Sequence, residues 1–135
     1  MIAADTSVIV RYLVGTPAAE ADAAATLIND IETAVGVSPV VLVECAHVLR
    51  SQYKVPHADI INALIELVQR ENVRVLGLRT QLVVEALVRA RSLPGRPIPD
   101  ALIVAGAIDG GATALATFDR GQSRYGFPTV DPGAA

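Results

Sequence analysis

Four acidic residues stand where a folded chain could gather them for chemistry. Asp5 closes the apolar stretch IAAD, Glu44 lies in the apolar stretch VVLVECAHVLR, Asp100 follows Pro99, and Asp119 comes shortly after TALAT. Carboxylates that lie close together repel one another unless a divalent cation neutralises them, and Mg²⁺ or Mn²⁺ prefers carboxylate and water oxygens as ligands. These residue types therefore indicate a site for a hard divalent ion.

Glu44 has the least ordinary surroundings of the four. Every residue from Val40 to Leu49 is apolar except Glu44 and His47. A helix through this stretch places Val40 and Val48 one turn to either side of Glu44, so we expect its carboxylate on an apolar stripe and not on a solvated face. A buried carboxylate needs a cation or hydrogen-bond donors. We predict that Glu44 is a residue of the functional site. The alternatives are that Glu44 forms an ion pair with a buried Arg or that it is exposed at the edge of the helix.

The three aspartates also have ordinary structural explanations. Asp5, before Thr6 and Ser7, can cap a helix, and Asp119 can form a turn. Asp100 in a first helical turn suits the positive end of the helix dipole. The order of the four acids therefore carries more information than any one of them.

Short apolar segments alternate with longer ones of helical periodicity along the chain. We expect strands at residues 2–5, 33–38, 73–76, 113–117 and 127–130. We expect helices at residues 7–14, 18–32, 39–53, 56–69, 80–92 and 99–108. Strands separated by helices pair in parallel, with the helices covering the sheet and sites forming at the carboxyl ends of the strands. The pattern predicts an α/β fold in which the four acids converge.

Length and composition favour one domain with an aliphatic core. The chain has 135 residues, 52% of them hydrophobic but only 4% aromatic. We expect the domain at residues 1–131 and a short tail at 132–135. The single Cys45 excludes an internal disulfide and favours a reducing cytoplasm, and no apolar run approaches the roughly 18 residues of a membrane span. The net charge of −3 argues against a broad basic surface for nucleic acid.

Other catalytic chemistries find little support. His47 and His57 have no partners at zinc-ligand spacing, so we expect both to be structural or exposed. The chain has no GxGxxG motif and no P-loop, and Ser7 does not lie in a nucleophile elbow. Covalent catalysis by Ser or Cys is therefore disfavoured.

Four short motifs, in order along the chain, together resemble a known family. They are Asp5-Thr6-Ser7 after the first strand, Glu44 in its apolar helix, PDALIVAGA from Pro99 to Ala107, and Thr117-Phe118-Asp119. Their order and approximate spacing resemble those of the PIN-domain ribonucleases, in particular the VapC toxins of bacterial type II toxin–antitoxin pairs. The resemblance implies that Asp5, Glu44, Asp100 and Asp119 form a catalytic quartet that binds Mg²⁺ or Mn²⁺, supported by Thr6, Ser7 and Thr117 near the metal or a phosphate.

The same resemblance implies a fold, an activity and partners. The fold is a three-layer α/β/α sandwich with a mainly parallel central sheet, and the activity is metal-dependent hydrolysis of RNA. The implied partners are the RNA substrate, a cognate antitoxin that blocks the acidic groove, and a second copy of the chain. We expect Arg96, Arg120 and Arg124 to contact the RNA backbone. The helices at 40–53 and 56–69 have more apolar residues than one narrow core-facing stripe needs. We expect the additional apolar residues to form part of an interface.

Two other functions remain open. The chain could be a non-catalytic or regulatory PIN-like binding module whose acids hold a structural ion or pair with an Arg of a partner. A small-molecule phosphohydrolase acting through an aspartyl intermediate is less well supported, because it needs a second Asp two residues after Asp5, where this chain has Ser7.

Overall fold

The structure is a computed structural model that describes residues 1–134. The last residue of the predicted tail, Ala135, lies outside the described residues. The helices are α1 (Thr6–Val14), α2 (Ala18–Asn29), α3 (Pro39–Ser51), α4 (His57–Val68), α5 (Thr80–Ala90) and α6 (Pro97–Asp109), followed by a short 3₁₀ helix, η1 (Arg120–Tyr125). The strands are β1 (Ile2–Ala3), β2 (Val35–Val37), β3 (Val73–Val75), β4 (Leu115–Ala116) and β5 (Thr129–Val130).

Local sequence signals explain where several helices begin and end. The Ser38 hydroxyl accepts a hydrogen bond from the backbone N–H of Val41 at 3.2 Å, and Pro39 fills the first turn of α3, where its missing N–H costs nothing. Helix α1 ends at Gly15, whose positive φ of 83° is a conformation that glycine adopts without strain. The predicted start of α3 and end of α1 are confirmed.

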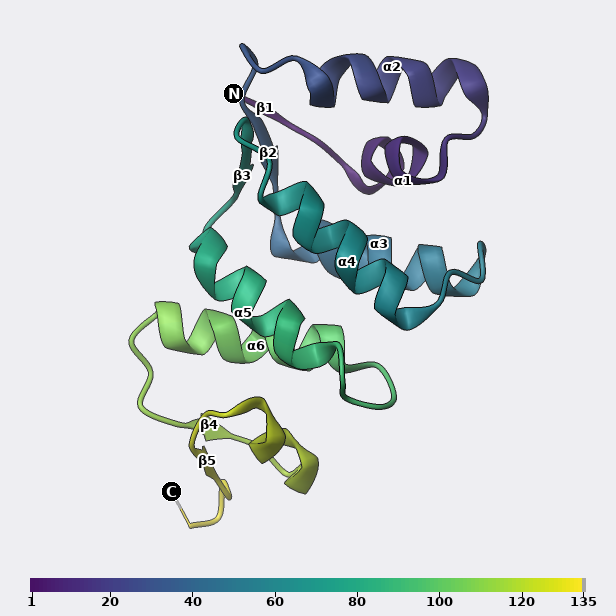
Figure 1. The fold of residues 1–135 in the computed structure, drawn as a ribbon. Coiled ribbons are helices and arrows are strands. Elements are labelled where there is room, and N and C mark those ends of the chain that lie inside the picture. Colours follow the sequence, from purple (N-terminus) through teal and green to yellow (C-terminus); the bar gives the residue numbers. More distant parts are fainter. Residues whose placement is uncertain (135) are drawn as a thin grey trace.

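All strand pairs are parallel, and they form two separate sheets. One sheet has the order β1-β2-β3, with Ile2 opposite Val35 and Val35 opposite Val73. The second contains only β4 and β5, with Leu115 opposite Thr129. Figure 1 shows β1–β3 near the N-terminus and β4–β5 beyond α6, near the C-terminus. The predicted α/β class with parallel pairing is confirmed.

The helices pack around one aliphatic core, both with sequence neighbours and with more distant helices. Helix α1 packs on α2 and α3, α3 on α4 and α6, and α5 on α4 and α6 (Figure 1). Ile9, Val35, Leu42, Ile61 and Leu87 are fully buried members of this core. Among residues 1–134, none of the helices combines the length and the apolarity that crossing a membrane requires.

Three local expectations are corrected. The apolar stretch IAAD suggests a buried first strand, but Ile2 is 51% exposed, because β1 lies at the edge of its sheet and its outer side pairs with no strand of residues 1–134. Helix α6 begins at Pro97 and not at Pro99, since a first-turn proline needs no N–H partner. Arg120 and Arg124 lie on η1, in a segment for which no helix or strand is predicted from the sequence.

Candidate active site

Asp5 and Glu44 are linked through the start of α1. The Asp5 carboxylate caps α1 by accepting a hydrogen bond from the backbone N–H of Ser7 at 2.8 Å, which occupies Oδ1. The next residue, Thr6, donates its hydroxyl to Oε2 of Glu44 at 3.1 Å. Residues that are far apart in sequence therefore meet here, and Thr6 fixes the Glu44 side chain.

Glu44 is exposed, so the expectation of a carboxylate on a buried stripe is wrong. Its neighbour one turn earlier, Val40, is 66% exposed, and His47 one turn later is exposed as well. The core-facing side of α3 is formed by Leu42, Cys45, Ala46 and Leu49 instead. Glu44 makes no ion pair within residues 1–134, and its only hydrogen bond there is the one from Thr6. Its carboxylate is thus accessible to a ligand.

Cys45 lies behind the two acids and is fully buried. Burial, together with the negative charges of Glu44 and Asp5, raises the pKa of its thiol from the ordinary 9.0 to about 12. The thiol lies 4.0 Å from the carbonyl oxygen of Thr6. A protonated, inaccessible thiol is a poor nucleophile, which agrees with the expectation that covalent catalysis by Cys is disfavoured.

Asp100 and Asp119 lie around η1. The Asp119 carboxylate accepts the backbone N–H of Gly121 at 2.8 Å, and the hydroxyl of Thr117 accepts the backbone N–H of Asp119 at 2.9 Å. Asp100 stands in the first turn of α6, half-buried. Burial raises the pKa of the Tyr125 hydroxyl, and the nearby charges of Asp100 and Asp119 raise it as well, although Arg124 opposes them. Both acids therefore act on the same tyrosine.

Gln122 and Tyr125 are two residues of the candidate site that were not predicted from the sequence. Both are buried on η1, and the side-chain amide of Gln122 donates to the backbone carbonyl of Asp100 at 3.4 Å. This contact ties η1 to the first turn of α6. A six-residue 3₁₀ helix has too little hydrophobic periodicity to be recognised in a sequence.

The donor chemistry suits a hard divalent ion, but the acids are not gathered around one point. Asp5 and Asp119 each have one carboxylate oxygen in a cap, and Glu44 has one bonded to Thr6, so each has a second oxygen without a hydrogen bond in the described part of the chain. Within residues 1–134, no three Asp, Glu, His or Cys side chains lie close enough to hold one ion. The structure thus brings Asp5 and Glu44 together through Thr6 and Asp100 and Asp119 near Tyr125, and metal binding by these two acidic pairs stays a prediction.

The other expected site residues lie around these two pairs. Ser7 is exposed in the first turn of α1, and Arg96 is exposed at the N-cap of α6. Arg124 places its guanidinium 6.0 Å from the ring centre of Tyr125. The roles of these residues in substrate binding stay predictions.

Comparison with protein families gives one decisive result. The family model for the PIN domain matches residues 2–128, nearly the whole chain. The chain belongs to the PIN domain family. A search of curated proteins found no match.

Membership of the family settles the general character of the protein. The PIN domain has a nuclease-type fold, and PIN domains commonly are metal-dependent nucleases. The helices and the parallel sheet agree with the predicted three-layer α/β/α arrangement of this family. The hydrolase character predicted from the acids is therefore supported at the level of the family.

Proposed function

We propose that this PIN domain is an endoribonuclease that uses Mg²⁺ or Mn²⁺ and acts in the cytoplasm as the toxin of a toxin–antitoxin pair. One observation carries this proposal: in a chain that matches the PIN family, Thr6, the residue after Asp5, donates its hydroxyl to Glu44 at 3.1 Å. Two of the four acids therefore come together although they are far apart in sequence, and each keeps one carboxylate oxygen without a hydrogen bond within residues 1–134.

The acids have different proposed roles. Asp5 and Asp100 are the principal ligands, Glu44 binds directly or through water, and Asp119 is an outer ligand or serves a second ion. A divalent ion bound there supplies a water of lowered pKa and stabilises negative charge on a scissile phosphate. Thr6 orients Glu44 through their hydrogen bond at 3.1 Å.

Polar and basic side chains near the acids are proposed to hold the RNA. Ser7 is exposed at the N-terminal end of α1, a position that favours phosphate oxygens. Thr117 supports Asp119, and Arg96, Arg120 and Arg124 are exposed. Guanidinium groups bind phosphate in a bidentate manner, so these arginines suit contacts with the RNA backbone.

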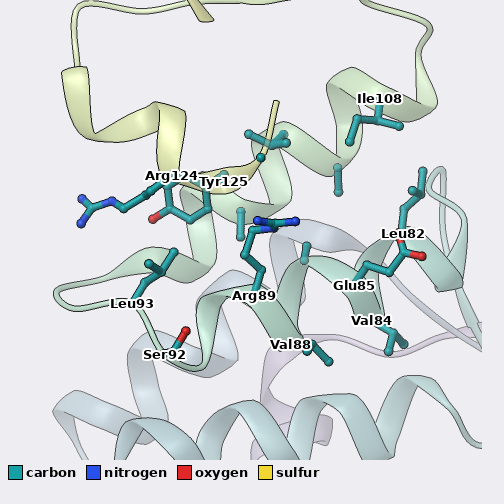
Figure 2. Close-up of a pocket in the computed structure, with 15 residues that line it drawn as sticks. Leu82, Val84, Glu85, Val88, Arg89, Ser92, Leu93, Ile108, Arg124 and Tyr125 are labelled. Carbon is teal, nitrogen blue, oxygen red and sulfur yellow. The ribbon is translucent and has the colours of Figure 1, made fainter. Parts of the chain in front are cut away.

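The two helices expected to carry an interface differ in their exposed apolar residues. Val40 on α3 is 66% exposed, whereas all the large aliphatic residues of α4 are buried or half-buried. A groove of about 580 Å³ also lies between α5, α6 and η1, where Val88 is 48% and Ile108 38% exposed (Figure 2). Arg89 points into this groove toward Tyr125. We place an antitoxin segment here, because an occupant would reach Tyr125, on which Asp100 and Asp119 act. A homodimer through the same groove is the alternative assembly.

A second function is favoured by the separation of the two acidic pairs. Within residues 1–134, no three metal-binding side chains lie close enough to hold one ion. A non-catalytic module that binds a partner through its acids would not need such a group. Such a module would bind RNA or an Arg-rich segment without turnover.

The test compares three purified proteins, free of any antitoxin, on labelled total RNA with Mg²⁺ or Mn²⁺. Asp5→Asn keeps the helix cap, because Asn caps as well as Asp does, but it removes the charge. Asp22→Asn is the matched control, since Asp22 is exposed on α2 and its side chain has no hydrogen bond within residues 1–134. We expect cleavage by the wild type and by Asp22→Asn, and none by Asp5→Asn. RNA left intact by the wild type with either ion would reject the nuclease proposal in favour of the binding module.

A further inference from the structure

A pocket with a basic lining lies between α3, α4 and the start of α6. Its volume is about 190 Å³, room for roughly six water molecules at ~30 Å³ each. Its polar side chains are His47, Arg50, His57 and Arg96, and no carboxylate lines it. The pocket thus holds two guanidinium groups in a chain of net charge −3.

The hydrogen bonds of the pocket leave its cationic groups available. The guanidinium of Arg50 donates to Nδ1 of His47 at 3.3 Å, which directs the His47 proton to Nε2. His57 is held by a hydrogen bond from Nε2 to the carbonyl oxygen of Ala90 at 2.9 Å. Within residues 1–134, neither Arg50 nor Arg96 forms a salt bridge. The charge of both arginines is therefore not neutralised by the protein.

The pocket borders the candidate active site on two sides. On α3, His47 and Arg50 follow Glu44 by three and six residues, which is about 4.5 and about 9 Å along the helix axis. On α6, Pro99 lines the pocket and Asp100 is the next residue. Glu44 and Asp100 thus belong to different acidic pairs, but each has neighbours on its own helix that line the same basic pocket.

We infer that this pocket binds a backbone phosphate of the RNA next to the site of cleavage. The inference rests on the proposed ribonuclease function. Exposed carboxylates repel a polyanion, so a strand that passes them needs cationic contacts close by. At a rise of ~3.4 Å per nucleotide, the distance of about 4.5 to 9 Å along α3 corresponds to about one to three nucleotides between the bound phosphate and the acids. Two guanidinium groups and the Nε2–H of His47 supply donors for phosphate oxygens, whereas two histidines alone are too few for a structural zinc site.

The test measures binding of a short fluorescein-labelled single-stranded RNA by anisotropy, in chelator so that no cleavage occurs. The proteins are the wild type, Arg50→Ala, Arg96→Ala and the double variant, each checked for folding by circular dichroism. Arg74→Ala is the matched control, because Arg74 is exposed on β3 and bonds only backbone carbonyls of its own segment. Each pocket variant should weaken binding by roughly tenfold. The double variant should reduce the slope of log K against log salt by roughly 0.7 for each phosphate that it no longer binds.

The outcomes separate this inference from the proposed function. If the wild type cleaves and binds RNA but the pocket variants bind like Arg74→Ala, with an unchanged salt slope, the phosphate site is rejected and the ribonuclease stands. If the wild type binds no RNA, both are rejected. If the pocket variants lose RNA binding while the wild type is inactive with either ion, the phosphate site stands on a binding module. Competition by inorganic phosphate against the labelled RNA, present in the wild type and absent in the double variant, would show that the pocket recognises the phosphate group itself.

Discussion

Replacing Glu44 by Gln separates a functional carboxylate from a structural one. The side chain is exposed, makes no ion pair within residues 1–134 and accepts one hydrogen bond from Thr6 at 3.1 Å. The amide oxygen of Gln can accept the same bond, and removal of the charge relieves repulsion with Asp5. The free energy of unfolding should therefore change by less than about 0.5 kcal/mol. For a chain of 135 residues this shifts Tm by less than about 3 °C.

Activity should respond far more strongly than stability. Loss of even an outer partner of a metal ligand costs roughly 10–100-fold, so loss of a direct ligand should lower RNA cleavage by at least ~100-fold. Cleavage of labelled RNA at saturating Mn²⁺ and thermal melting measure the two effects. Glu66→Gln is the control, since Glu66 is exposed on α4 and forms no salt bridge in residues 1–134. A Glu44→Gln protein that cleaves RNA like this control, or that is unfolded, would refute the reasoning.

Three further predictions follow from other parts of the molecule. Asn72→Ala should destabilise the fold by roughly 3 kcal/mol in denaturant unfolding, because the buried amide donates to three backbone carbonyls; an unchanged midpoint would contradict this. The folded pKa of Cys45 is raised from 9.0 to about 12, so its contribution to stability is present below pH 9 and is lost as the pH rises toward 12, by up to about 4 kcal/mol. The Tm of Cys45→Ala should therefore decrease less between pH 9 and pH 12 than the Tm of the wild type. An equal decrease in both proteins would refute the raised pKa of Cys45. Mn²⁺ at 100 times its Kd should stabilise the wild type by ~2.7 kcal/mol and so raise its Tm, and it should raise the Tm of Asp5→Asn less. Equal Tm values in chelator and in Mn²⁺ would count against metal binding.

Local signals in the sequence predict most of the element boundaries. Ser38 with Pro39 predicts the start of α3, and Gly110 predicts the end of α6, because caps depend on neighbouring residues alone. The α/β class follows in the same way from alternating apolar segments. The division into two sheets does not, since the pairing of β4 with β5 but not with β1 depends on contacts distant in sequence.

The candidate site is predicted in its residues but not in its geometry. The apolar neighbours of Glu44 suggest that it is buried. In the structure, however, Val40 and Glu44 lie one turn apart on the solvent-facing side of α3, so both are exposed. His47 and His57 have no recognisable spacing, yet the packing of α3 on α4 brings both into one pocket. Such convergence arises from tertiary packing, which periodicity within a single helix does not encode.

The separate β4–β5 sheet has a consequence for the order of folding. Pairing of Leu115 with Thr129 closes a loop of 14 residues, whereas pairing of Val35 with Val73 closes one of 38. The shorter loop costs roughly 0.9 kcal/mol less closure entropy. The C-terminal segment can therefore form its strand pair before the N-terminal sheet assembles, and it can open locally without disturbing β1–β3. Amide hydrogens of β4 and β5 should then exchange with solvent at a rate independent of those in β2.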